Sequence, residues 1–79
     1  MSPTVFRYKG YHFFFFSQEE KRMHIHTRSS NGEAKFWIEP AVSLSRSFGF
    51  STRELKQLEG IIEEHRDEIT AAWKKHFKS

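Results

Sequence analysis

The chain has no cysteine among its 79 residues, which excludes disulfide bonds and cysteine-ligated zinc. This absence is typical of proteins that stay in a reducing cytosol. Long hydrophobic runs are missing too: the longest, residues 13–16, is far too short to cross a bilayer, and the first residues show no signal peptide. We therefore expect a cytoplasmic protein that does not enter a membrane.

Negative charge is scarce in the first half of the chain. Residues 1–38 carry six Lys or Arg side chains against three Glu, whereas residues 39–79 carry seven of each sign. The whole net charge of +3 therefore belongs to the first half. A basic half of this kind suits nucleic acid or an acidic protein partner, although +3 is also an ordinary charge for solubility.

Aromatic residues are plentiful for a chain of this size. A chain this short forms one domain, here residues 1–79, and buries only about 60–65% of the surface that its unfolded form exposes. Its core must therefore be dense in large side chains. Nine Phe, two Trp and two Tyr meet that need, because each buried aromatic ring removes about 150–250 Å² from water.

Alternating apolar residues and turn signals predict four strands in the first half of the chain. The strands are expected over residues 4–8, 11–17, 23–28 and 33–38. Short turns join the first two and the last two, so neighbouring strands should run antiparallel. We therefore predict an antiparallel β-meander over residues 4–38.

A connecting segment and a helix are predicted for the rest of the chain. Residues 39–50 read as the connection, with a short helical turn near residues 42–46. A capping box, Ser51 with Glu54, opens an amphipathic helix over residues 51–78 that can bend or break near Gly60 or near His65. The predicted fold class is α+β: a four-stranded meander with a long C-terminal helix packed on one face.

The period-two pattern of the third and fourth strands separates an apolar face from a chemically capable one. The apolar side chains expected to meet across the core are Met23, Ile25, Ala34, Phe36 and Ile38 from the sheet, and Leu55, Leu58, Ile62, Ile69 and Trp73 from the helix. The opposite sheet face is expected to carry His24, His26, Arg28, Lys35 and Trp37, reachable from water. A slip of one residue would exchange the two faces, so this prediction requires a buried Phe36.

Several short motifs run through the chain. They are Pro3–Arg7, Gly10, Phe13–Ser17, His24-x-His26, Gly32–Pro40, Gly49–Phe50 and Glu54–Leu55. Together they resemble a family of very short bacterial proteins known as a domain of unknown function. Members are often encoded beside a second small protein, in pairs that look like toxin–antitoxin modules. The resemblance therefore implies a protein partner encoded by the adjacent gene, and the lack of a helix-turn-helix favours the toxin-like half.

Binding without chemistry is the preferred interpretation. The aromatic second strand, the basic sheet face and the helix can together form a docking surface for that partner, since exposed aromatic and Arg side chains are typical interface anchors. No cofactor is predicted.

Metal-independent RNA cleavage is the first alternative. His24 and His26 are candidates for the acid and base, because the unperturbed pKa of histidine lies near 6.5. Lys35, Arg7 and Arg28 can hold a phosphate, and Trp37 or Phe14 can stack a base. This alternative makes RNA a candidate ligand.

A histidine-ligated metal is the second alternative. His24 and His26 stand two residues apart on one strand, a spacing that can chelate one ion. His12 on the neighbouring strand, or Glu33 near the hairpin turn, can supply a third ligand. Histidines on a half-buried strand also serve simply as hydrogen-bonding residues, and that interpretation stays open.

Overall fold

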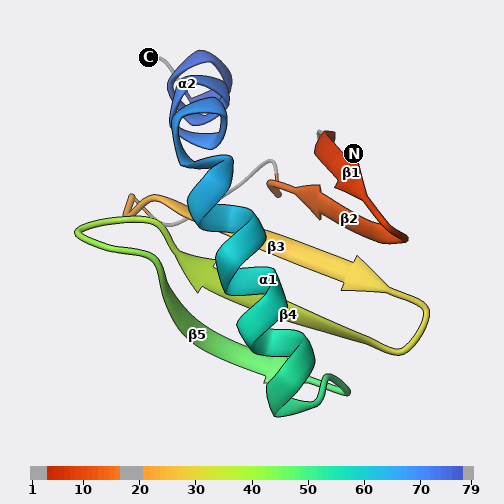
Figure 1. The fold of residues 1–79 in the computed structure, drawn as a ribbon. Helices are drawn as coiled ribbons and strands as arrows, with labels where there is room; N and C mark the ends of the chain where they lie inside the picture. Colours follow the sequence, from red (N-terminus) through yellow and green to blue (C-terminus); the bar gives the residue numbers. More distant parts are fainter. Residues whose placement is uncertain (1–3, 17–20, 78–79) are drawn as a thin grey trace.

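The computed structural model describes residues 4–16 and 21–77 and has an α+β fold (Figure 1). Five strands form one sheet in which all neighbours are antiparallel and the spatial order follows the sequence. They are β1 (Thr4–Tyr8), β2 (Tyr11–Phe14), β3 (His24–Ser29), β4 (Gly32–Trp37) and β5 (Ser43–Phe48), followed by helices α1 (Thr52–Glu64) and α2 (Arg66–His76). The predicted meander is confirmed, with one strand and one helix more than expected. Ser17 and residue 78, the ends of a predicted strand and of the predicted helix, lie outside the described residues.

Strand β5 corrects the prediction of a short helical turn near residues 42–46. It pairs with β4 along one side and is the last strand in the sheet order. Every residue of β5 is exposed. Its backbone is held by the β4 ladder rather than by burial of an apolar face. The sequence Ser-Leu-Ser-Arg-Ser-Phe alternates, but its period-two residues include Arg and are not uniformly apolar, so the strand signal is weak.

The turn after β5 depends on a close approach of two glycines. Gly49 has a φ of +87°, a conformation that side-chain-bearing residues rarely adopt. A Cβ atom at this position would lie 2.9 Å from the Cα of Gly32 and would collide with the carbonyl oxygen of Asn31. Only glycine lets the end of β5 sit this close to the β3–β4 turn.

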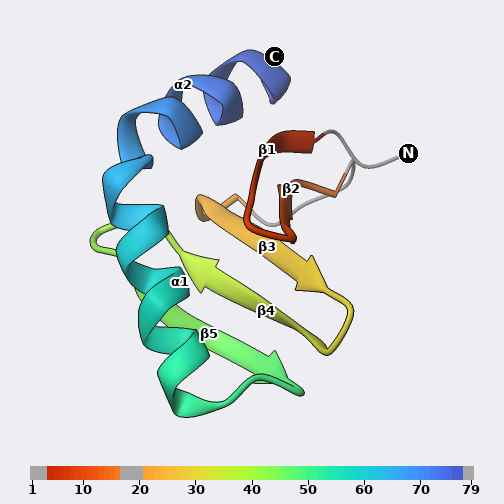
Figure 2. The same ribbon diagram turned by 45° about the vertical axis from the view of Figure 1, so that its right-hand side comes forward.

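The predicted apolar face is confirmed. Phe36 is fully buried, whereas Trp37 is half-buried, so the register is the predicted one. Helix α1 crosses one face of β3, β4 and β5, and α2 continues toward the β1–β2 hairpin (Figures 1 and 2). The buried core residues are Phe13, Phe15, Met23, Ile25, Ala34, Phe36, Ile38, Val42, Leu58, Ile62, Ile69 and Trp73.

The helix breaks at His65, one of the two points that the sequence predicted. The residue ends α1 and precedes α2, with a backbone conformation outside the helical range. Its ring stacks on Phe6 of β1 with centroids 4.2 Å apart, and its Nδ1 donates a hydrogen bond to Glu68. The break turns α2 toward the β1–β2 hairpin, where Trp73 packs edge-on against Phe15.

The predicted capping box is present and joins α1 to the sheet. Ser51 Oγ accepts from the backbone N–H of Glu54, and the Glu54 carboxylate accepts from the backbone N–H of Ser51. The same carboxylate accepts from Asn31 Nδ2 at 3.0 Å and from the Tyr11 hydroxyl at 3.4 Å. The hydrogen bonds from Ser51 and Asn31 lower the pKa of Glu54.

This lowered pKa predicts a specific loss of stability in acid. Because the pKa of Glu54 is lower in the folded than in the unfolded chain, its contribution is complete above the unfolded value and disappears as pH falls through the folded value. In Glu54→Gln, the fall of the melting temperature between about pH 5 and pH 3 should be shallower than in the wild type. Glu59→Gln, an exposed position on the same helix, should keep the wild-type slope. Parallel slopes for all three proteins would contradict the prediction.

Among the described residues, no helix is both long enough and apolar enough to cross a membrane.

Candidate binding face on the open side of the sheet

The side of the sheet opposite both helices, here called the helix-free face, carries two rows of aligned side chains. Cross-strand pairing places each residue directly beside its partner on the next strand. The arginine row runs across β1 to β5 as Arg7, His12, Arg28, Glu33 and Phe48. The lysine row runs across β2 to β5 as Phe14, His26, Lys35 and Arg46. Most of the side chains predicted to share this face therefore do share it.

His24 is the exception, and the prediction that it is reachable from water was wrong. Its ring is fully buried, and it donates a hydrogen bond from Nδ1 to the carbonyl oxygen of Arg22 at 2.7 Å. The ring lies edge-on to Trp37 and to Trp73 of α2, with centroids 5.6 and 5.2 Å apart. His24 begins β3 where α2 passes the end of the sheet, so the tertiary packing covers it. His26, two residues later, is half-buried.

Phe14 and Trp37 were predicted to stack a base, but their rings are already in contact with neighbours. Phe14 is only 4% exposed. The side chains that cover it are His12, Phe16, His26 and Arg28, with separations of 5.0 to 5.7 Å. The Trp37 ring has the guanidinium of Arg22 at 4.2 Å and the Lys35 Nζ at 4.5 Å. The Phe14 ring is therefore covered, and the half-buried Trp37 ring already contacts two cations.

Lys35 is less accessible than the sequence predicted. It is 7% exposed, although alternation places it on the helix-free face. It lies in the middle of the lysine row, between His26 and Arg46. Its ammonium lies 4.5 Å from the centre of the Trp37 ring. Lys35 therefore adds positive charge to the face, but little of its side chain is accessible to a ligand.

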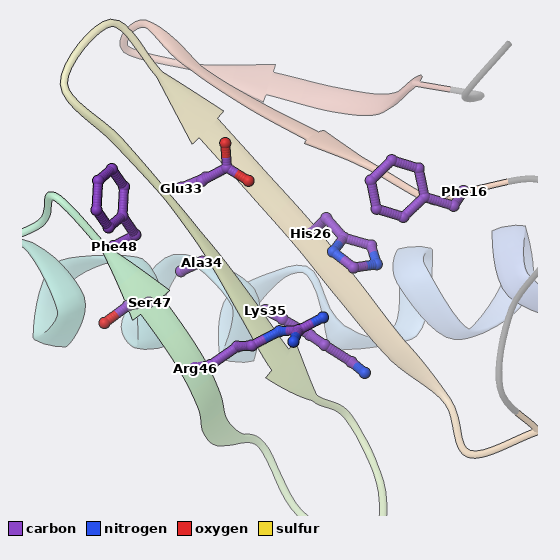
Figure 3. Close-up of a pocket in the computed structure, with 8 residues that line it drawn as sticks. All are labelled: Phe16, His26, Glu33, Ala34, Lys35, Arg46, Ser47 and Phe48. Atoms are coloured by element: carbon purple, nitrogen blue, oxygen red, sulfur yellow. The ribbon is translucent and has the colours of Figure 1, made fainter.

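Three residues that the sequence reasoning missed complete the face. Phe48 is 78% exposed and Phe16 is 39% exposed, and both line a cavity of about 180 Å³ together with Arg46 (Figure 3). The remaining residues that line this cavity are His26, Glu33, Ala34, Lys35 and Ser47. Arg46 and Phe48 alternate with serines, and this period-two pattern was the sequence signal that could have predicted a strand here.

The arginine row has a positive potential that acts on His12. Burial lowers the pKa of His12, and the neighbouring guanidinium groups of Arg7 and Arg28 lower it further. A hydrogen bond of 2.6 Å joins His12 Nε2 to the Thr4 hydroxyl and fixes the ring. Glu33 lies 3.9 Å from Arg28 and is the one carboxylate that the described residues bring into either row. Cations therefore outnumber anions on this face.

The metal alternative requires three ligands in one place. His24 and His26 lie side by side with ring centroids 5.1 Å apart, and the Phe14 ring contacts both His26 and His12. Within residues 4–16 and 21–77, no group of three or more His, Cys, Asp or Glu side chains is close enough to hold an ion. Of the predicted ligands, His24 and His26 are therefore neighbours, but His12 does not complete a three-ligand group with them.

The sequence also matches a known protein family over most of its length. A family model described as a domain of unknown function, DUF4160, matches residues 10–74. The chain belongs to this family. The match covers β2 to β5, α1 and most of α2, so only the first strand and the end of α2 lie outside the DUF4160 region among the described elements. Comparison with curated proteins and with solved structures gives no match.

Proposed function

We propose that this DUF4160 protein acts by binding a protein partner on the helix-free face, as the toxin-like half of a two-protein module. The observation that carries the proposal is the pair of exposed rings, Phe16 and Phe48, on either side of a cavity that Arg46 also lines. Aromatic and Arg side chains around a pocket are the usual anchors of a protein interface. Exposed rings that gather beside a pocket are typical of an interaction site.

The charge of the face favours a partner with an acidic surface. Within the described part of the chain, the two rows contain one carboxylate, Glu33, and four cationic side chains, Arg7, Arg28, Lys35 and Arg46. Glu33 already lies 3.9 Å from Arg28. Complementary charge across an interface speeds association and excludes partners of the wrong sign. The neighbouring gene's protein, which the family resemblance implies as the partner, should therefore present carboxylates and an apolar pocket.

The ribonuclease alternative finds less support than partner binding. Cleavage by two histidines requires both imidazoles within reach of the substrate. His24 is sealed by Trp37 and Trp73, which leaves His26 alone from the predicted pair. We therefore propose binding, rather than cleavage, as the activity of the face.

Capture of the adjacent gene's protein tests the proposal. Tagged wild-type protein co-expressed with that neighbour should retain it in a fixed ratio. Phe48→Ala with Arg46→Gln should weaken capture at least about a hundredfold, because each hot-spot truncation costs about 2 kcal/mol or more. Tyr8→Ala is the matched control: it removes an exposed ring from β1 on the side of the sheet that faces the helices. Tyr8→Ala should bind like the wild type.

The same strains distinguish the toxin-like role from simple binding. Expression without the neighbour should slow growth, and co-expression should restore it. A wild-type protein that is a monodisperse monomer and ignores the neighbour would overturn the proposal. So would equal loss of capture in the Tyr8→Ala control and the double variant.

A further inference from the structure

We infer that the arginine row contains a phosphate-binding site, formed by Arg7, His12 and Arg28, that takes a phosphodiester of single-stranded nucleic acid. The site lies at the β1–β3 end of the helix-free face. Phe48 and Arg46, which carry the protein-partner proposal, lie at the β5 end. The inference goes beyond the proposed function and needs no second protein.

The geometry gathers cations around one imidazole. Arg7 pairs directly with His12 from β1, and Arg28 pairs directly with His12 from β3. Arg7 and His12 also line a cavity of about 280 Å³. The other residues that line it are Tyr8, Lys9, Gly10 and Tyr11, so no carboxylate is among the described residues of its wall. An oxyanion in this cavity meets the Arg7 guanidinium and the His12 ring, and Arg28 adds its positive charge from the neighbouring strand.

The cost of this arrangement points to a ligand. Like charges on directly opposed strand positions destabilise a sheet. Here His12 has an arginine on each side; burial lowers the pKa of its imidazole, and the two guanidinium charges lower it further. Glu33 lies on the far side of Arg28, at 3.9 Å, and does not stand between Arg28 and His12. A bound anion offsets the two guanidinium charges that disfavour protonation of His12.

The rest of the face favours a single strand over a free phosphate. A second row of cations, Lys35 and Arg46, runs parallel to the first and two residues along the strands. Phe16 and Phe48 present exposed rings beside it. Rings on which bases stack and a basic surface that follows the backbone are the features that proteins use to bind single strands. A duplex hides its bases and so cannot use the rings.

Fluorescence anisotropy with a labelled uridine oligonucleotide tests the site. The wild type should bind it, and Arg7→Gln and Arg28→Gln should each weaken binding about tenfold, as expected for loss of one charged hydrogen bond. Each should also reduce the slope of log affinity against log salt by about 0.7, the value for one single-strand phosphate. Arg53→Gln, an exposed arginine at the start of α1, is the control of equal charge change and should match the wild type.

The pH dependence gives a second readout that a structural role would not produce. The groups that face His12 are Arg7 and Thr4 from β1, Phe14 from its own strand and Arg28 from β3. A bound phosphate offsets the two guanidinium charges, so nucleic acid should raise the pKa of His12 in an NMR titration. Affinity should therefore increase as pH falls from about 8 to about 5.5, and His12→Gln should flatten that increase.

The outcomes are separable. Failure of the wild type to bind the oligonucleotide, equal loss in Arg53→Gln, or an unchanged His12 pKa would overturn the site. Binding of poly-glutamate as tight as that of the oligonucleotide would overturn the nucleic-acid assignment and favour an acidic protein. Inorganic phosphate that competes only at far higher concentration supports a single strand. Because these assays contain no partner protein, failed capture of the neighbour leaves their result unaffected.

Discussion

Trp73→Ala should lower the free energy of unfolding by about 3–5 kcal/mol, the usual cost of removing a buried aromatic ring. Trp73 anchors α2: it packs edge-on against Phe15, lies 4.2 Å from the Phe77 ring and covers His24. A domain of 79 residues has about 4–12 kcal/mol of stability in total, so this one substitution removes a large share. Urea denaturation followed by circular dichroism measures the change.

Two further variants keep this prediction testable if Trp73→Ala does not fold. Trp73→Phe retains a ring at the same place and should cost about 1–2 kcal/mol. Lys74→Ala changes the next, exposed residue of the helix and should stay within about 0.5 kcal/mol of the wild type. A Trp73→Ala protein that loses no more stability than Lys74→Ala would show that α2 is not held by this ring.

His24→Ala and His26→Ala should differ sharply, although the two residues are only two positions apart in the same motif. His24 is a buried ring with a hydrogen bond to the Arg22 carbonyl, so its loss leaves a cavity and an unsatisfied acceptor. We expect it to cost about 2–4 kcal/mol. His26 is half-buried on the helix-free face, and its substitution should cost less than about 1 kcal/mol. Thermal unfolding of the two variants gives the comparison.

The same pair separates structural from functional roles of the histidines. His26→Ala should weaken capture of the partner protein by the folded variant, since His26 lines the cavity between Phe16 and Phe48. Folded His24→Ala protein, assayed below its lowered melting temperature, should still bind. A His24→Ala protein that has wild-type stability but does not capture the partner protein would contradict this assignment and indicate a functional role for His24.

Much of the sheet followed from local patterns. The alternation of Met23 to Arg28 and of Glu33 to Ile38 predicted which residues face the helices, and the buried Phe36 confirms that register. The capping box at Ser51 and the break at His65 were also local signals. Each depends on residues within a few positions of one another, where period, turn chemistry and capping leave little choice.

The candidate site was harder to predict because accessibility is a long-range property. Alternation assigned Lys35 to the helix-free face correctly, and Phe14 was expected to stack a base, yet both side chains are buried. Strand β5 was not predicted because all of its residues are exposed, and Arg46 and Phe48 on that strand were therefore missed as well. The periodicity of a sequence does not show which side chains from other segments will cover a given ring in the folded protein.

By itself, the sequence determined the strand alternation, the turns and the helix start, because these depend on side-chain chemistry at neighbouring positions. Only the tertiary structure decided that α2 covers His24 and that β5 adds Arg46 and Phe48 to the face. It also decided that His12 stands between two arginines. The physical reason is that strand order and helix placement bring together residues from separate segments, and burial and charge depend on all of them at once.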